Sequence, residues 1–160
     1  MSDSIEEKLK KMGITLPTPE PYASPNRTHG VIVNNVLYLS GHGSCRAAMI
    51  PGAKATGKVG GDVTEQEAYK SSRAVAIAMI ASIKKCAGSL DRVKRVIRLY
   101  GLVNSAPGFN RQFAVIDGAS DLFYEVWGPE AGQHAGAADG IAELPRDSAV
   151  EIMGEFEISK

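Results

Sequence analysis

The sequence has little of what several functional classes need. Its 18 basic and 18 acidic residues give a formal net charge of +0, and aromatic residues make up only 6% of the chain. Affinity for nucleic acid depends on phosphate neutralisation and base stacking, so this composition argues against a nucleic-acid partner. No apolar run approaches the ~20 residues that cross a membrane, and we therefore expect no membrane partner.

Cysteine is also scarce. Cys45 and Cys86 are the 2 cysteines of the chain, and they lie far apart in the sequence. They form no metal-type pair, so no metal site is expected, and isolated cysteines are typical of free thiols in a reducing compartment. The N-terminal residues 1–7 are polar and acidic, unlike a signal peptide. These features together predict a cytoplasmic protein.

The residues that are present predict one domain over residues 1–160. A hydrophobic content of 44% in 160 residues is enough for a single core. The N-terminal segment 1–26 reads as a short helix over 4–12, closed by Gly13, and a proline-rich lead-in. Val31–Val33 and Val36–Leu39 are typical of a β-hairpin, with Asn34-Asn35 at its turn.

The remaining elements follow from capping and periodicity. Glycine-rich residues 40–62 predict a loop, and Thr64 with Glu67 forms a capping-box signature for a helix that ends near Ala87. A strand over 93–103, a turn over 104–108 and a helix over roughly 110–127 come next. The last two strands, the first beginning at Gly136, read as a hairpin through 144–147. The order β-β-α-β-α-β-β predicts an α+β fold, a mixed sheet backed by two helices.

Several motifs carry a family resemblance. The segments are LYLSGHGS (37–44), NSAPGF (104–109), VIDGASDLFYEVWG (115–128) and HAGAADGIAELP (134–145). From about residue 26 to 158 the chain resembles the Rid family, also called the YjgF family. The resemblance implies a chorismate-mutase-like fold, a homotrimer with a small-molecule pocket at each subunit interface, and no cofactor. It also implies hydrolysis of reactive enamines and imines, such as 2-aminoacrylate, to a keto acid and ammonia.

The chain departs from the family at the arginine that clamps the substrate carboxylate. In the pattern HARSAVG this arginine falls on Gly136, and a bidentate guanidinium–carboxylate pair is lost with it. Two interpretations stay open. Either the chain keeps the fold without imine hydrolysis, or Gly136 and Ala138 leave space for a bulkier ligand and other polar groups supply the chemistry.

Four further positions are candidates for that chemistry. The resemblance places the family's water-positioning glutamate on Glu151, which by strand alternation alone is equally a solvent-facing residue. It also puts Asp117 near the same pocket, where like-charge repulsion would raise the pKa of Glu151; the alternative is that Asp117 is a solvated acid on its helix. Arg27 stands where the family often has a tyrosine, and is either a replacement guanidinium or a solvated loop residue. His42 is either an acid–base group or a hydrogen-bonded turn residue.

A Gly-rich turn lies beside these candidates. Ser40 and Gly41 precede His42 and are expected to contribute to ligand binding. The sequence thus favours a divergent enamine or imine hydrolase that uses Glu151, His42 and Asp117. A non-catalytic metabolite-binding module of the same fold is the alternative, and an endoribonuclease is favoured less.

Overall fold

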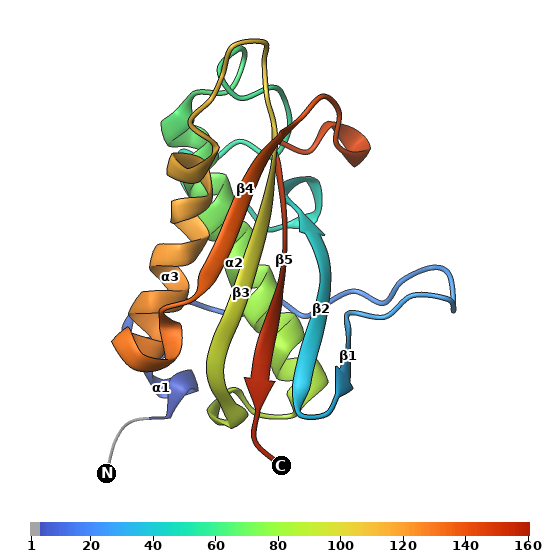
Figure 1. Ribbon diagram of the computed structural model, residues 1–160, viewed down its shortest axis with the longest axis vertical. Coiled ribbons are helices and arrows are strands. Elements are labelled where there is room, and N and C mark those ends of the chain that lie inside the picture. The colour runs from blue at the N-terminus through green and yellow to red at the C-terminus, as the bar shows by residue number, and fades with distance from the viewer. Residues whose placement is uncertain (1–3) are drawn as a thin grey trace.

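The computed structural model describes residues 4–160 and contains one mixed sheet of five strands with the order β1-β2-β5-β3-β4. Helices α2 and α3 cover one face of the sheet, and α1 packs at their lower end (Figure 1). The bounds are α1 Ile5–Lys11, β1 Gly30–Val33, β2 Val36–Gly43, α2 Glu65–Ala87, β3 Val93–Asn104, α3 Gln112–Gly132, β4 Ala135–Ile141 and β5 Val150–Ile158. The predicted α+β architecture, a mixed sheet backed by two helices, is therefore confirmed.

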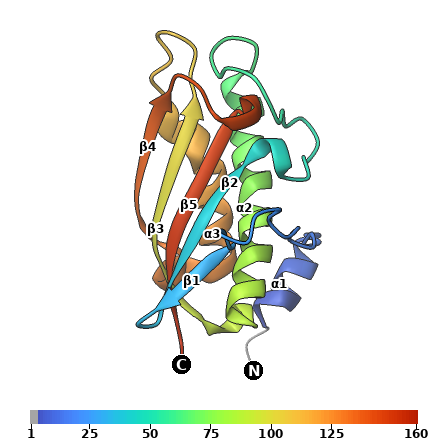
Figure 2. The ribbon, with the colours of Figure 1, turned by 90° about the vertical axis from the view of Figure 1, so that its right-hand side faces the viewer.

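The two layers leave the other face of the sheet uncovered. In Figure 2 the strands lie in front of α2 and α3, and we call the face turned away from these helices the open face. The core lies between the sheet and the helices, where Phe123 stacks on Trp127 and contacts Phe156 at ring-centroid distances of 5.5 Å. Within residues 4–160, no helix has both the length and the apolar character needed to cross a bilayer.

Local signals set the element ends as predicted. The Thr64 hydroxyl accepts from the Glu67 amide, and the Glu67 carboxylate accepts from the Thr64 amide, so both halves of the capping box are present. Helix α2 ends at Gly88, whose φ of 83° suits glycine. Asn34 and Asn35 turn the β1–β2 hairpin with φ values of 49° and 64°.

Strand β2 runs further than its glycine content predicted. Residues 40–43 were expected to begin a loop, but His42 and Gly43 pair with Ile152 and Glu151 of β5. The pairing passes through an irregularity between Leu39 and His42. Backbone hydrogen bonds to a neighbouring strand thus outweigh the low strand propensity of glycine.

The predicted hairpin of the last two strands is wrong. Strand β4 pairs in parallel with β3, whereas β5 lies between β2 and β3 and is antiparallel to both. The segment 142–149 therefore reverses the chain direction as expected but carries it across the end of β3. Helix α3 also continues past the predicted end at 127, through a kink at Gly128, to Gly132.

Candidate functional site

A hollow lies on the open face, at the end of the sheet formed by β1, β2 and β5. Its volume is about 400 Å³, and it is lined by Tyr22, Asn26, Arg27, Thr28, Gly30, Val31, Tyr38, Ser40, Gly41 and Glu151. Four of these residues come from the segment that leads into β1, so parts of the chain far apart in sequence meet here. The sequence candidates Arg27, Ser40, Gly41 and Glu151 share this hollow.

A bulge in β2 shapes the floor of the hollow. Leu39 pairs with Gly154 and His42 with Ile152, so Ser40 and Gly41 together stand opposite Met153. A Cβ atom at Gly41 would overlap the carboxylate of Glu151. The carboxylate occupies the space that a side chain at this position would take, which explains why glycine suits the bulge here.

The wall of the hollow is tied to the sheet through Ser40. The Ser40 amide donates to the carbonyl of His29 at 2.8 Å, and the Ser40 hydroxyl donates to the carbonyl of Thr28 at 2.6 Å. The ring of Tyr22 contacts the ring of His29 at a centroid distance of 5.2 Å. These contacts fix the backbone directly after Arg27, so Ser40 acts as a structural support rather than as a free ligand-binding hydroxyl.

The two charged residues of the hollow have no side-chain partner in the part of the chain that the structure describes. Over residues 4–160, neither Arg27 nor Glu151 makes a side-chain hydrogen bond or an ion pair. By contrast, each of Arg73, Arg98 and Arg111 pairs with a glutamate. Two lining residues of opposite charge that pair with no group in this part of the chain are both available to a ligand.

His42 faces away from this hollow. Its ring lies on the helix side of β2, where Nδ1 donates to the Ser40 carbonyl at 2.6 Å and Nε2 accepts from the Ser82 hydroxyl of α2 at 2.8 Å. A carbonyl can only accept, which fixes this tautomer of the neutral ring. The expectation that His42 serves the pocket as an acid–base group does not fit this placement, because the bulge turns its side chain toward α2.

Because His42 is enclosed between β2 and α2, the folding stability of the protein should depend on pH. Burial lowers the pKa of His42 below its ordinary value of 6.5. Below pH 6.5 His42 is therefore protonated in the unfolded chain more readily than in the folded chain. The free energy of unfolding decreases as the pH is lowered through this range. We expect the urea midpoint of the wild-type protein to be lower at pH 5.5 than at pH 7.5. In His42→Gln the midpoint should change less between these two pH values. Equal pH slopes in the two proteins would contradict this assignment.

Asp117 does not line the hollow either. It lies exposed on α3, in the layer that covers the opposite face of the sheet. The residue is exposed overall, but partial desolvation of its carboxyl group and, next, the nearby Asp121 carboxylate raise the pKa of Asp117. The predicted effect of Asp117 on Glu151 within one chain is thus not supported, because the sheet lies between the helix layer and the open face.

Gly136 and Ala138 lie on the edge strand β4. Strand β3 separates β4 from β5, so neither residue lines the hollow of its own chain. Ala138 packs against the core, and a Cβ atom at Gly136 would have only the Leu99 carbonyl within 4 Å, at 3.3 Å. A larger side chain at position 136 therefore meets one tight backbone contact and is otherwise open to its surroundings.

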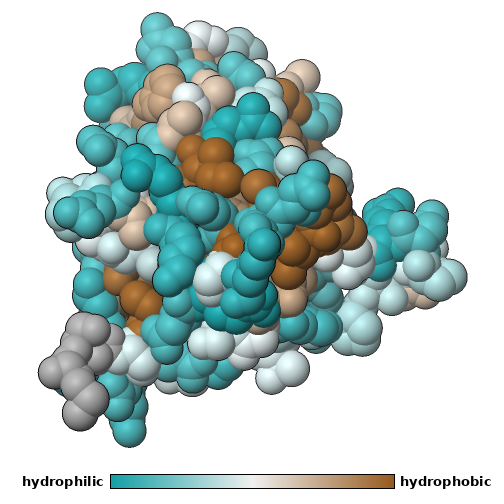
Figure 3. All heavy atoms as spheres, turned by 60° about the horizontal axis from the view of Figure 1, so that its bottom comes forward, coloured by the Kyte–Doolittle hydropathy of each residue, from teal (hydrophilic) through white to brown (hydrophobic). Residues whose placement is uncertain are grey.

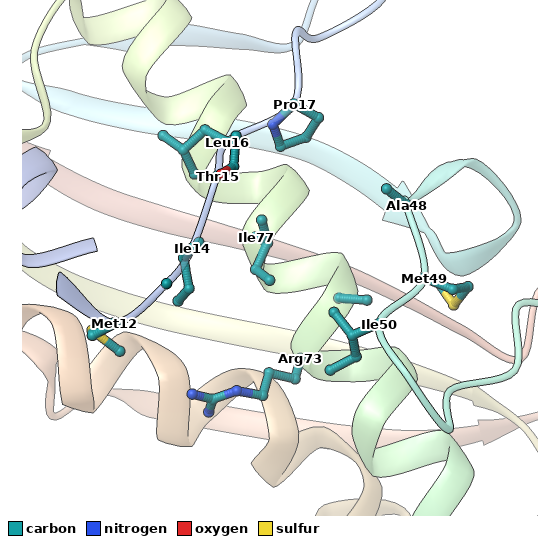
Figure 4. Close-up of a pocket in the computed structure, with 12 residues that line it drawn as sticks. Met12, Ile14, Thr15, Leu16, Pro17, Ala48, Met49, Ile50, Arg73 and Ile77 are labelled. Atoms are coloured by element: carbon teal, nitrogen blue, oxygen red, sulfur yellow. The ribbon is translucent and has the colours of Figure 1, made fainter. Parts of the chain in front are cut away.

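A second crevice, on the helix side, has a different character. It has a volume of about 380 Å³ and lies between the lead-in, the segment 48–50 and α2. Figure 4 shows mostly apolar side chains here, among them Met12, Ile14, Met49, Ile50 and Ile77. Its arginine, Arg73, is paired with Glu125 at 2.6 Å. The crevice lacks a free charged pair, so the open-face hollow is the better candidate site.

Sequence reasoning missed two aromatic residues of the hollow. Tyr38 alternates with the buried Leu37 and Leu39 in β2, and this pattern would have placed it on the open face beside Ser40. Tyr22 lies in the lead-in, where no periodicity indicates its direction. Within the described part of the chain, no cluster of three or more His, Cys, Asp or Glu residues is arranged to hold a metal ion.

Comparisons with known proteins agree with this architecture. Residues 7–153 match the family described as "YjgF/chorismate_mutase-like, putative endoribonuclease". Protein TCP17 of Trypanosoma cruzi is 35% identical over 158 residues, which cover 99% of this chain and 96% of that protein.

Two crystal structures are also similar. The protein Atu1372 of Agrobacterium tumefaciens, whose function is described as unknown, has a TM-score of 0.83 and 39% identity, covering 98% of this chain and 94% of its own. A Shewanella oneidensis protein described as a "putative endoribonuclease" has a TM-score of 0.87 and 29% identity, covering 98% and 100%. The matched residues span most of the chain and confirm the resemblance seen in its motifs: the chain belongs to the YjgF/chorismate mutase-like family.

Proposed function

We propose that the protein hydrolyses a small reactive imine or enamine in the open-face hollow. The observation that carries this proposal is the unpaired carboxylate of Glu151, which lies over Gly41 and shares the hollow with the unpaired Arg27. This carboxylate accepts no hydrogen bond from the residues that the structure describes, so it is free to accept one from a water molecule. Such a carboxylate is suited to general-base chemistry.

The proposed reaction needs only water and proton transfer. An enamine first tautomerises to the imine, and Glu151 takes a proton from a water molecule as its oxygen attacks the imine carbon. That proton then passes to the nitrogen and gives the carbinolamine. Glu151 next takes the proton of the carbinolamine hydroxyl and returns it to the nitrogen, so that the carbon–nitrogen bond breaks and ammonia leaves as the carbonyl forms. The balance is imine plus water to carbonyl compound plus ammonia, so no redox partner is required.

We infer that a further copy of the chain covers the open face and closes the hollow, most simply in a homotrimer. Val31, Val33 and Tyr38 have exposed fractions of 52%, 53% and 48%. Figure 3 shows apolar surface at the end of the molecule that carries the β1–β2 turn. Large exposed apolar residues of this kind favour a protein contact. In such an assembly Gly136 of a neighbouring copy would border the hollow.

Two other functions remain as alternatives. A metabolite-binding module would use the same hollow without turnover, and the missing arginine at Gly136 favours it. The descriptions of the family and of the Shewanella relative both name an endoribonuclease. A polyanionic substrate fits the hollow less well, since its two charged residues, Arg27 and Glu151, have opposite signs.

The proposal is tested with imines and enamines generated in situ from amino acids of different size. We expect ammonia release and keto-product formation for a member larger than 2-aminoacrylate, and Gly136→Arg should shift the preference toward 2-aminoacrylate by adding a carboxylate partner. A wild-type protein that is silent on every member would refute hydrolysis. If Gly136→Arg then gained activity on 2-aminoacrylate, the hollow would be that of a binding module.

A further inference from the structure

The lead-in gives the hollow a cation that the family's β4 arginine does not supply here. We propose that Arg27 is the anion anchor of this site, and that its ligand is a monocarboxylic acid with an aromatic or long apolar side chain. The inference rests on the proposed role of the hollow as a ligand site. It does not depend on turnover, because it concerns only what binds and where.

Arg27 is the unpaired cation of the hollow. Arg27 lines the hollow, its guanidinium has no acidic partner within residues 4–160, and no other arginine or lysine is among the lining residues. Guanidinium groups pair with carboxylates through two parallel hydrogen bonds. The adjacent residues are held by Ser40, so Arg27 starts from a backbone that is already fixed. A ligand carboxylate is the natural partner for this cation.

The charge of the hollow limits the ligand to a single negative charge. Glu151 contributes one carboxylate to the same hollow as Arg27, and the remaining lining residues are uncharged. A phosphate dianion would gain one cation and meet the Glu151 carboxylate with its second charge, which is unfavourable at short range. A monocarboxylate pairs with Arg27 and leaves Glu151 free to face the neutral end of the ligand.

The walls indicate the rest of the ligand. The volume of about 400 Å³ lies in the range of about 300–1,000 Å³ that holds drug-sized ligands, and a three-carbon acid would fill little of it. The lining is polar for the most part, and Tyr22, Val31 and Tyr38 provide its apolar and aromatic portion. An aromatic side chain can stack against a tyrosine ring with offset or edge-to-face geometry. The ligand is therefore larger than the acid derived from 2-aminoacrylate.

The test measures binding of unreactive 2-oxo acids, namely pyruvate, 2-oxobutanoate and phenylpyruvate, by calorimetry or ligand-observed NMR. We expect phenylpyruvate to bind most tightly, and Arg27→Gln to weaken it by about tenfold or more, as loss of a charged hydrogen-bonded pair predicts. Arg46→Gln is the matched control, because Arg46 is exposed and lies outside the hollow. Glu151→Gln should keep or improve binding, since it removes a negative charge.

The outcomes separate this inference from the proposed hydrolysis. Equal affinity of Arg27→Gln and wild type, no binding of any of the acids, or tighter binding of phenyl phosphate than of phenylpyruvate would each overturn the inference. Pyruvate binding as tightly as phenylpyruvate would overturn the assignment of the apolar side chain. Binding that depends on Arg27 in a protein without imine turnover would support the anchor while refuting the hydrolase.

Discussion

Glu151→Gln is expected to lower kcat for the best substrate by about 10²-fold or more, which is the usual contribution of a general base. The amide keeps the size and shape of the carboxylate but cannot take the proton from water. Because the Glu151 side chain has no hydrogen bond or ion pair with another group of residues 4–160, the change removes no polar contact of the fold. The loss should therefore appear in the rate of ammonia release and not in the thermal midpoint.

Glu157→Gln provides the matched control. Glu157 lies on the same strand, is exposed and does not line the hollow. The same chemical change at this position should leave kcat within about twofold, as expected for a surface site away from the reacting groups. If both variants lost activity equally, the loss would reflect the strand or the assembly rather than a proton acceptor in the hollow.

Gly41→Ala supplies a second test of the same carboxylate. The added methyl group would displace the Glu151 side chain, since the two would overlap. In the wild-type background we expect a lower kcat, because small displacements of a catalytic group are costly. In the Glu151→Gln background the same substitution should have little further effect on kcat. Additive losses would show that the two residues act independently.

The features that the sequence predicted correctly are helix ends and turns, which are determined by interactions between residues close together in the chain. The capping box of Thr64 and Glu67, the turn at Asn34-Asn35 and the stop at Gly88 all depend on neighbours within a few positions, and all are confirmed. The partner of each strand depends on the whole sheet. The segment 142–149 contains turn residues in either topology, so nothing local indicates that β3 separates β4 from β5.

The candidate site likewise depends both on motifs that the sequence shows and on the arrangement of the whole sheet, which it does not show. Arg27 and Glu151 were selected by motif position, and their meeting in one hollow required the lead-in to fold back over β2. His42 and Asp117 were selected in the same way but lie elsewhere in the single chain. For His42 the cause is the bulge at Ser40-Gly41, which reverses the alternation of β2 and turns the ring toward Ser82. A one-residue irregularity of this kind has no reliable sequence signal.

The close contact of α2 and α3 gives the largest expected effect on stability. A Cβ atom at Gly118 would lie 2.9 Å from the backbone carbonyl carbon of Tyr69 and 3.2 Å from the backbone nitrogen of Arg73. The two helices are joined on this face by the Tyr69–Asp121 hydrogen bond at 2.7 Å and by the ion pair of Arg73. A methyl group at Gly118 cannot be accommodated by a side-chain rotation, so the helices must separate and these contacts must lengthen.

Gly118→Ala is therefore expected to destabilise the protein by about 2–3 kcal/mol, near the upper part of the usual range for overpacking. This net value already allows for the gain of about 1 kcal/mol when alanine replaces glycine in a helix. The thermal midpoint should fall by roughly 8 °C for a chain of this length, measured at matched protein concentration because assembly also raises it. Gly61→Ala is the control: its nearest neighbour would be the Lys58 carbonyl at 3.4 Å, an ordinary contact, so its midpoint should change little. If Gly118→Ala had the same thermal midpoint as Gly61→Ala, α2 and α3 would tolerate separation. The close approach of the two helices at Gly118 would then not contribute to stability.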